Sequence, residues 1–309
     1  MISSFLTKIA TIALIALLSL TSYGCSTTAI SCSKSDDTKL IHEKSFSVSS
    51  NDHISISPAG GDIKVTSWGK NEVLIKVYGN ERAKELLTFT AEQSGSKITV
   101  KLEPEKGNHM NGVRVRCEVM VPEKFQVSGN TAGGDISVEQ IDGSINLNTA
   151  GGDIRVVKIN GSVEVNTAGG DISVKQLKGS LSANTAGGDV KVSETDGDVT
   201  VSTAGGDVKI AGKNGKVEAS TAGGDIAIHY DGENNGISAS TMGGDIEVRV
   251  PSSIKADVKL NTMSGSLSVD VPGSVVQSKE RNRISAQLNG GGREISCNTM
   301  AGDISVKTK

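Results

Sequence analysis

The sequence has few aromatic residues, and this scarcity limits the kind of core it can build. One Trp, three Tyr and four Phe occur among 309 residues, together with five prolines. A conventional globular core relies on the large apolar surface of aromatic side chains. The 37 glycines, in contrast, make up about 12% of the chain, against roughly 7% on average. The composition therefore predicts a fold that buries small and β-branched side chains by repetition.

Charge and cysteine content exclude two more classes of protein. The 32 Lys and Arg residues nearly balance the 35 Asp and Glu residues, which leaves a net charge of −3. Nucleic-acid binding needs a strong positive excess, so we expect no nucleic-acid partner. Four cysteines in a chain of this length do not make a disulfide scaffold either.

Residues 1–24 are typical of an export signal peptide. Lys8 precedes the twelve-residue apolar run Ile9–Leu20. A membrane-spanning helix needs about 20 apolar residues, so the run is too short for an anchor.

The signal ends in a sequence that resembles the bacterial lipobox. Gly24 and Cys25 match the site at which a cysteine is diacylglycerated, although Ser22 stands where leucine is usual. We expect lipidation at Cys25, which would anchor the protein to a membrane of the cell envelope. The outer membrane is favoured because Ser26 is not the aspartate that retains lipoproteins at the inner membrane. The polar segment 25–40 would be a flexible tether, and the alternative is an ordinary secretory cleavage site beside a chance cysteine.

An exact internal repeat dominates the rest of the chain. The tetrad Ala-Gly-Gly-Asp recurs every eighteen residues, with its aspartate at Asp135, Asp153, Asp171, Asp189, Asp207 and Asp225. Looser copies lie at 241–245, 262–266 and 299–303, and an earlier copy lies at 58–62.

Each repeat predicts two short strands with one buried face. Apolar residues alternate with polar ones, as at Ile136 and Val138 and again at Ile145 and Leu147. Two strands in eighteen residues fit one coil of a parallel β-solenoid, whereas a propeller blade needs about 40 residues. The sequence therefore predicts an all-β fold in which residues 127–309 form about ten coils, stacked about 4.8 Å apart.

Residues 41–126 are β-rich but irregular. We expect strands at 53–57, 73–77, 97–102 and 113–121, and one short helix at 80–87. This region is interpreted as a mixed cap that covers the edge of the first coil, since a bare sheet edge invites aggregation.

Several motifs resemble a known family. Val119-Met-Val-Pro122 leads into Thr131-Ala-Gly-Gly-Asp-Ile136, a second Val-Pro pair lies at 250–251, and the closing segment 290–304 repeats the Gly-Asp-Ile element. These features resemble the bacterial putative adhesin domain family, β-solenoid domains of unknown function related to the head GIN domains. The resemblance covers residues 45–309, and it implies a β-solenoid with an adhesion role.

The repeated aspartates are the candidate site. The column comprises Asp135, Asp153, Asp171, Asp189, Asp207, Asp225 and Asp245. Stacked carboxylates about 4.8 Å apart repel by about 1–3.5 kcal/mol per pair, depending on the dielectric. We interpret each as a solvent-facing acceptor of N–H bonds within its own turn. The alternative is a row of Ca²⁺ sites, as in repeats-in-toxin proteins, but the Ala-Gly-Gly-Asp spacing departs from that motif.

Two further columns and two cysteines have structural interpretations. Thr149 shares the phase of inward-facing residues, so its column should point inward, while Asn148 and its equivalents should form an outward polar ladder. Cys117 and Cys297 should be buried free thiols too far apart to pair, and Cys32 lies in the tether.

The sequence predicts no enzyme, no metal and no cofactor, because it shows no catalytic constellation or metal-ligand spacing. We expect a cell-envelope lipoprotein that presents a repetitive surface for adhesion or to an envelope partner, which could be a protein or a glycan. A periplasmic structural or stress-response scaffold and, more distantly, a solenoid carbohydrate-active enzyme are the alternatives.

Overall fold

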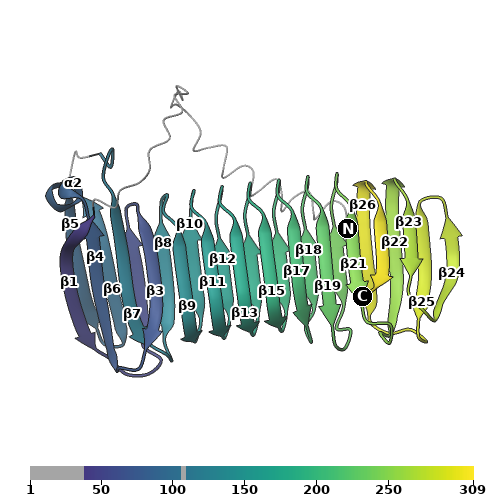
Figure 1. The fold of residues 1–309 in the computed structure, drawn as a ribbon, viewed down its shortest axis with the longest axis horizontal. Coiled ribbons are helices and arrows are strands. Elements are labelled where there is room, and N and C mark those ends of the chain that lie inside the picture. The colour runs from purple at the N-terminus through teal and green to yellow at the C-terminus, as the bar shows by residue number, and fades with distance from the viewer. Residues whose placement is uncertain (1–37, 106–108) are drawn as a thin grey trace.

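The computed structural model describes residues 38–105 and 109–309, and it shows two long sheets packed face to face along a rod (Figure 1). The 13-stranded sheet, here sheet A, and the 14-stranded sheet, sheet B, enclose one apolar core. Sheet A contains, in spatial order, β1 (Lys39–Ser47), β4 (Glu72–Gly79), β7 (Val115–Pro122), β3 (Asp62–Trp68), β9 (Ile136–Asp142), β11 (Ile154–Asn160), β13 (Ile172–Lys178), β15 (Val190–Asp196), β17 (Val208–Lys213), β19 (Ile226–Asp231), β21 (Ile246–Val250), β27 (Ile304–Thr308) and β23 (Leu267–Asp270).

Sheet B faces it with a second series of strands. In spatial order these are β24 (Ser274–Glu280), β25 (Arg283–Leu288), β22 (Ala256–Ser264), β26 (Glu294–Ala301), β20 (Ile237–Ser240), β18 (Val217–Ser220), β16 (Val199–Ser202), β14 (Leu181–Asn184), β12 (Val163–Asn166), β10 (Ile145–Thr149), β8 (Gln126–Thr131), β2 (His53–Pro58), β6 (Lys97–Pro104) and β5 (Leu87–Ser94).

The predicted parallel β-solenoid of two-strand, eighteen-residue coils is confirmed. Ile154 pairs with Ile136 in sheet A, and Val163 pairs with Ile145 in sheet B, each eighteen residues apart. The alternating apolar positions are buried between the sheets. One coil cannot fold alone, because the few aliphatic side chains it buries do not offset the ordering of eighteen backbones. Stacking on neighbours supplies the missing hydrogen bonds and burial.

Glycine is required where consecutive turns meet. A Cβ atom on Gly152 would lie 2.1 Å from the carbonyl oxygen of Gly134, in the turn of the preceding coil. A Cβ on the adjacent Gly151 would have no atom nearer than 3.9 Å. The second glycine of each tetrad therefore sets how closely the turns stack, whereas the first glycine of the array's tetrads would meet only ordinary van der Waals contacts.

The region 41–126, which we expect to cover the edge of the first coil, contributes strands to both sheets of the solenoid. β2 and β3 form a parallel coil directly against β8 and β9, and β6 and β7 form another coil outside it. The expected helix is present as α2 (Glu81–Leu86), where the side chain of Asn80 accepts a hydrogen bond from the Ala83 amide at 3.0 Å. Antiparallel β1, β4 and β5 complete this end of the rod.

The coils do not stack in simple sequence order at the C-terminal end. The last coil, β26 and β27, lies between the coil of β20 and β21 and the coil of β22 and β23 (Figure 1). Its turn fits there because the Ala301 amide donates to the Met242 carbonyl at 3.0 Å. The segment of β24 and β25 is an antiparallel hairpin rather than a coil, because it has no Gly-Asp turn.

The two described cysteines are free and buried, as predicted. Burial raises the pKa of both Cys117 and Cys297 to about 12, and the neighbouring Glu118 carboxylate adds to the effect at Cys117. Both thiols therefore stay protonated inside the core.

The proposed signal peptide, Cys25 and Cys32 lie outside the described residues. Within residues 38–105 and 109–309, no helix has the length and apolar character needed to cross a membrane.

Replacing Gly152 by alanine should destabilise the rod by about 1–3 kcal/mol, the cost of forcing atoms into a filled space. Replacing Gly151 by alanine should change stability by less than about 0.5 kcal/mol, since its new methyl group meets no atom closely. Urea unfolding of both variants measures the difference. Equal midpoints for the two variants would contradict the stacking role of the second glycine.

Candidate functional site

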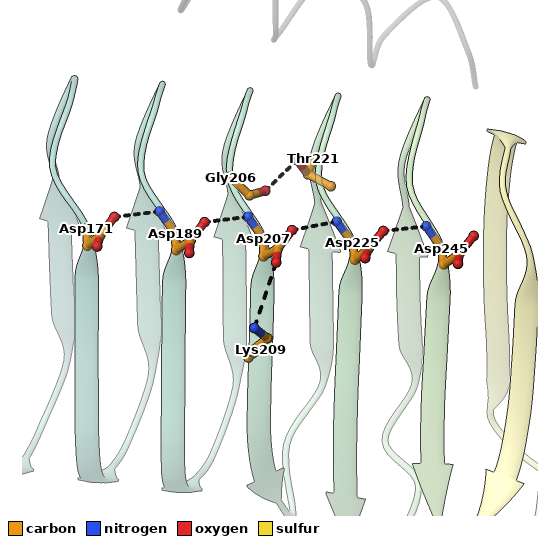
Figure 2. A network of polar contacts seen from close by, with 8 residues as sticks. All are labelled: Asp171, Asp189, Gly206, Asp207, Lys209, Thr221, Asp225 and Asp245. Atoms are coloured by element: carbon orange, nitrogen blue, oxygen red, sulfur yellow. Dashed lines mark hydrogen bonds and ion pairs between the residues drawn. The ribbon is translucent and has the colours of Figure 1, made fainter.

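The aspartate column is a continuous chain of hydrogen bonds between coils (Figure 2). The Asp207 amide donates to Oδ1 of Asp189 at 2.8 Å, and the Asp225 amide donates to Oδ1 of Asp207 at 3.0 Å. The same bond joins the tetrads from Asp62 to Asp303. Our expectation that each carboxylate is bonded within its own turn is therefore wrong, because the donor comes from the next coil.

These bonds explain how the column tolerates its charge. Hydrogen bonds to a charged group contribute about 1.5–3 kcal/mol each, which is comparable to the repulsion of about 1–3.5 kcal/mol between neighbouring carboxylates. At Asp207 the second oxygen also faces a cation, since Oδ2 lies 3.8 Å from Nζ of Lys209. The aspartates thus hold successive coils in register.

The threonine column is inward-facing, as predicted, and it locks the same turns from inside. The Thr221 hydroxyl donates to the Gly206 carbonyl at 3.0 Å and accepts from the Gly224 amide at 3.2 Å. Gly206 belongs to the preceding coil and Gly224 to the same turn as Thr221. Each threonine therefore joins its own turn to its neighbour.

The predicted polar ladder is also present on sheet B. The Asn166 side-chain amide donates to Oδ1 of Asn148 at 2.9 Å, and Asn184 donates likewise to Asn166 at 2.9 Å. Where serine replaces asparagine, Ser220 donates to Ser202 at 3.3 Å. The ladder occupies this outward column with contacts between coils.

The aspartates do not converge on one point. Each lies one coil from the next, with one oxygen already accepting an amide hydrogen (Figure 2). Ca²⁺ needs six to eight oxygen ligands, and no group of three or more His, Cys, Asp or Glu side chains suited to a metal occurs in the part of the chain described.

A different feature, a long open groove, lies on sheet A. It has a volume of about 1010 Å³ and runs from Trp68 on β3 across β9, β11, β13, β15, β17 and β19 to Lys309. It crosses the strands near their C-terminal ends, so its axis follows the axis of the rod.

A column of left-handed residues creates this groove. Gln140, Lys158, Gln176 and Glu194 have φ angles of 61°, 58°, 57° and 54°. This conformation is unfavourable for residues other than glycine, by roughly 1–2 kcal/mol. Each one inserts an extra residue between two inward-facing positions, as a β-bulge does, and turns an exposed side chain out along the groove.

Positively charged, negatively charged and amide side chains all line the groove, so it offers both hydrogen-bond donors and acceptors. Oδ2 of Asp196 lies 3.6 Å from Lys213, and Oδ2 of Asp231 lies 2.5 Å from Lys309. Farther along, the Asn160 side-chain amide donates to Oδ1 of Asp142 at 3.1 Å. Asp142, Asp196 and Asp231 are therefore partnered, and side chains of both charges line the surface.

Trp68 supplies an aromatic surface at one end of the groove. Its indole N–H donates to the Glu72 carbonyl at 2.7 Å, which fixes the ring. The Lys70 ammonium lies 4.6 Å from the ring centroid on one face. The ring is half-buried, so it can still contact a ligand in the groove.

One buried hydroxyl in the groove wall has no hydrogen-bond partner. Thr195 is 1% exposed and continues a column whose earlier members are Ile141, Ile159 and Leu177. It pairs with Gly212 on the next strand, where the bulge is absent and the register shifts. The Thr195 hydroxyl thus stands where the preceding coil has the apolar side chain of Leu177, and it makes no hydrogen bond.

The sequence could have indicated the groove but did not single it out. The signal is the broken alternation after Val138, where two residues instead of one separate it from the next buried side chain, Ile141. The aspartate, threonine and asparagine columns, which the sequence did single out, serve the stacking of coils. Cys25, the expected lipidation site, lies outside the described residues.

Comparison with protein families identifies the fold. The model of the family described as Toastrack DUF4097 matches residues 51–307. The chain belongs to the Toastrack DUF4097 family. The matched span of this Toastrack domain includes β2 to β7, so the region expected to be a cap is part of the family domain. No curated protein matches the chain.

Solved structures resemble the Toastrack domain at low identity. A putative adhesin from Bacteroides fragilis NCTC 9343 is 15% identical, with 87% of this chain and 97% of that chain covered and a TM-score of 0.43. A putative lipid binding protein from Parabacteroides distasonis ATCC 8503 is 17% identical, with 88% and 97% covered and a TM-score of 0.36. A putative cell adhesion protein from Clostridium sporogenes ATCC 15579 is 14% identical, with 87% and 99% covered and a TM-score of 0.23. At these scores the names carry no argument about the site.

Asp189→Ala should destabilise the rod by about 1 kcal/mol, because the Asp207 amide loses its acceptor. Asp189→Asn keeps an acceptor oxygen and removes one charge, so its stability should stay within about 0.5 kcal/mol of the native protein. Thermal unfolding measures both variants.

Thermal unfolding with and without millimolar Ca²⁺ should give the same midpoint for the native chain. A rise of several degrees with Ca²⁺ would revive the calcium interpretation.

Thr195→Val should stabilise the protein by about 1 kcal/mol, because it removes a buried hydroxyl without a partner and keeps the side-chain shape. Thr221→Val is the matched control, and it should destabilise the rod because that hydroxyl makes two hydrogen bonds. Chemical unfolding measures both. A loss of stability in Thr195→Val equal to that of the control would refute the assignment.

Proposed function

We propose that this Toastrack protein is a non-enzymatic adhesion protein of the cell envelope, anchored by a lipid on Cys25, whose groove on sheet A binds an extended glycan. The observation that carries the proposal is the open groove of about 1010 Å³ that follows the rod axis. The adhesin-type resemblance in the sequence agrees with this role.

The length of the groove favours a polymer over a small molecule. It crosses seven neighbouring strands, from β3 to β19. Strands in a sheet lie about 4.8 Å apart, so the groove is about 29 Å long. Small-molecule sites enclose most of their ligand, whereas this groove is open and passes over successive coils. A chain of repeating units suits such a surface.

The direction of the groove favours a glycan over a peptide. A peptide that adds to a sheet runs along the strands, but this groove runs across them. Side chains on one face of an extended peptide repeat every 6.6–6.8 Å or so, which does not match a coil spacing of about 4.8 Å. One sugar unit of an extended glycan is close to one coil in length. The interleaved lysine, asparagine and carboxylate groups suit neutral hydroxyls, and Trp68 offers one stacking surface.

The chemistry of the groove supports binding rather than catalysis. Glycoside hydrolysis uses a pair of carboxyl groups on either side of the bond that is cleaved. Asp196 and Asp231 each pair with a lysine, and Glu194 lies 3.3 Å from Lys175. Groups held in this way bind and orient a polymer.

A glycan array with the purified protein tests the groove. The variant Lys158→Ala, Gln176→Ala and Lys178→Ala removes three exposed side chains that line it. It should weaken binding to linear glycans at least tenfold. The matched control, Glu164→Ala, Ser182→Ala and Glu218→Ala, removes two charges and one polar group from sheet B and should bind normally. Binding to matrix proteins alone, or equal loss in both variants, would refute the glycan site.

Protease treatment of intact and lysed cells tests the location of the same protein. Loss of the protein on intact cells is expected for a surface adhesin, and release of the Cys25→Ser variant into the medium or the periplasm is expected if the lipid is the anchor. Protection until lysis would contradict adhesion and favour the periplasmic scaffold.

A further inference from the structure

A second set of residues forms a separate cluster at the corner where the tetrads turn. The residue after the turn threonine is alanine in six successive tetrads, from Ala132 to Ala222. In the last three turns of the rod it is methionine instead, at Met242, Met300 and Met263. The sequence contains six methionines in all, so half of them occupy this one column.

The out-of-order last coil brings these three methionines side by side. β26 pairs with β22 so that Thr299 lies opposite Thr262, which places Met300 directly opposite Met263. On the other side, the Ala301 amide donates to the Met242 carbonyl at 3.0 Å. The spatial order is therefore Met242, Met300, Met263, at the strand spacing of about 4.8 Å. In the sequence, Met242 lies 58 residues and Met263 lies 37 residues before Met300.

Two of these side chains are exposed to an unusual degree for apolar groups. Met263 is 75% exposed and Met300 is 50% exposed, and only Leu40, Val275 and Val276 are comparable among the large apolar residues in the described ranges. Met242 is half-buried beside them. Three adjacent thioethers on an open corner contribute little to the core, which indicates a role at the surface.

We propose that Met242, Met300 and Met263 form a thioether site for one soft monovalent metal ion, Cu(I) in the cell. Methionine has a flexible side chain with three rotatable bonds, so sulfur atoms on strands about 4.8 Å apart can converge above the middle coil. Soft thioether ligands select Cu(I), whereas carboxylate and imidazole ligands suit harder ions. The site is independent of the glycan groove, which lies on sheet A near the other ends of the strands.

The neighbouring groups leave this site to the thioethers. Asp245 and Asp303 follow Met242 and Met300 by three residues, but Oδ1 of Asp245 accepts the Asp303 amide at 2.7 Å, and Oδ1 of Asp303 accepts the Ser266 amide at 2.7 Å. The buried Cys117 and Cys297 belong to the core rather than to this corner. A thioether-only set of ligands therefore distinguishes Cu(I) from Zn²⁺ and Ca²⁺.

Competition with a chromogenic Cu(I) chelator, and calorimetry with Ag(I) as a redox-inert probe, test the site on the full chain. Any accessible thiol is first alkylated so that it does not bind the metal. The native chain should bind one ion. Met300→Leu, which keeps the apolar shape and removes the central sulfur, should weaken binding at least tenfold, while Met120→Leu on β7 should bind as the native chain does.

A sulfur-specific readout separates metal binding from simple apolar contact. The methyl resonances of Met242, Met263 and Met300 should shift on addition of Ag(I), and those of Met110 and Met120 should stay in place. Absence of binding to the native chain, or unchanged binding by Met300→Leu with an unchanged unfolding midpoint, would overturn the proposal.

Discussion

The approach of one Gly-Gly-Asp turn to the next is the constraint on which the rest of the structure depends. The second glycine of a tetrad has no room for a side chain, because the carbonyl of the preceding turn fills that space. The aspartate carboxylate then reaches the amide of the next coil, and the threonine hydroxyl reaches back to the previous one. Together these contacts keep every coil in register with its neighbours. An error of one residue would turn all the apolar side chains outward.

This regular stacking turns small side chains into a core. The residues buried between the sheets are mainly valine, isoleucine and leucine, and only Phe125 and Tyr230 are fully buried aromatics in the described chain. β-branched side chains pack well on a pleated surface, and repetition lets each column meet the same neighbour in the next coil. The scarcity of aromatic residues is therefore compatible with a long, continuous core.

Two local features give the surface of the rod its distinct chemistry. The left-handed residues Gln140, Lys158, Gln176 and Glu194 add one residue to a strand and open the groove. The change from alanine to methionine at the last turns alters the chemistry of the opposite corner. Both features repeat from coil to coil, so the solenoid multiplies a small local change into an extended or clustered surface. Function is thus expected in columns rather than at single residues.

The sequence by itself determined the coil. The eighteen-residue period, the alternation at Ile136 and Val138, and the capped helix after Asn80 depend on local spacing, and each was predictable because strand and turn preferences act over a few residues. The inward threonines and the asparagine ladder followed from the same parity. The partner of each aspartate did not, because a turn motif shows an acceptor without showing which coil supplies the donor.

Only the tertiary structure decided the order of the coils at the two ends and the surfaces that follow from it. The turns at Asp245 and Asp303 have nearly the same sequence and form the same hydrogen bond between coils. The last coil can therefore stack on the coil of β20 and β21, although the two are far apart in the sequence. The last coil enters between β20 and β22, and the hairpin of β24 and β25 covers the other side of β22, an arrangement with no local signal in the sequence. The groove left only the broken alternation after Val138 as a trace in the sequence, and the positive φ of Gln140 that accompanies it is a property of the folded backbone.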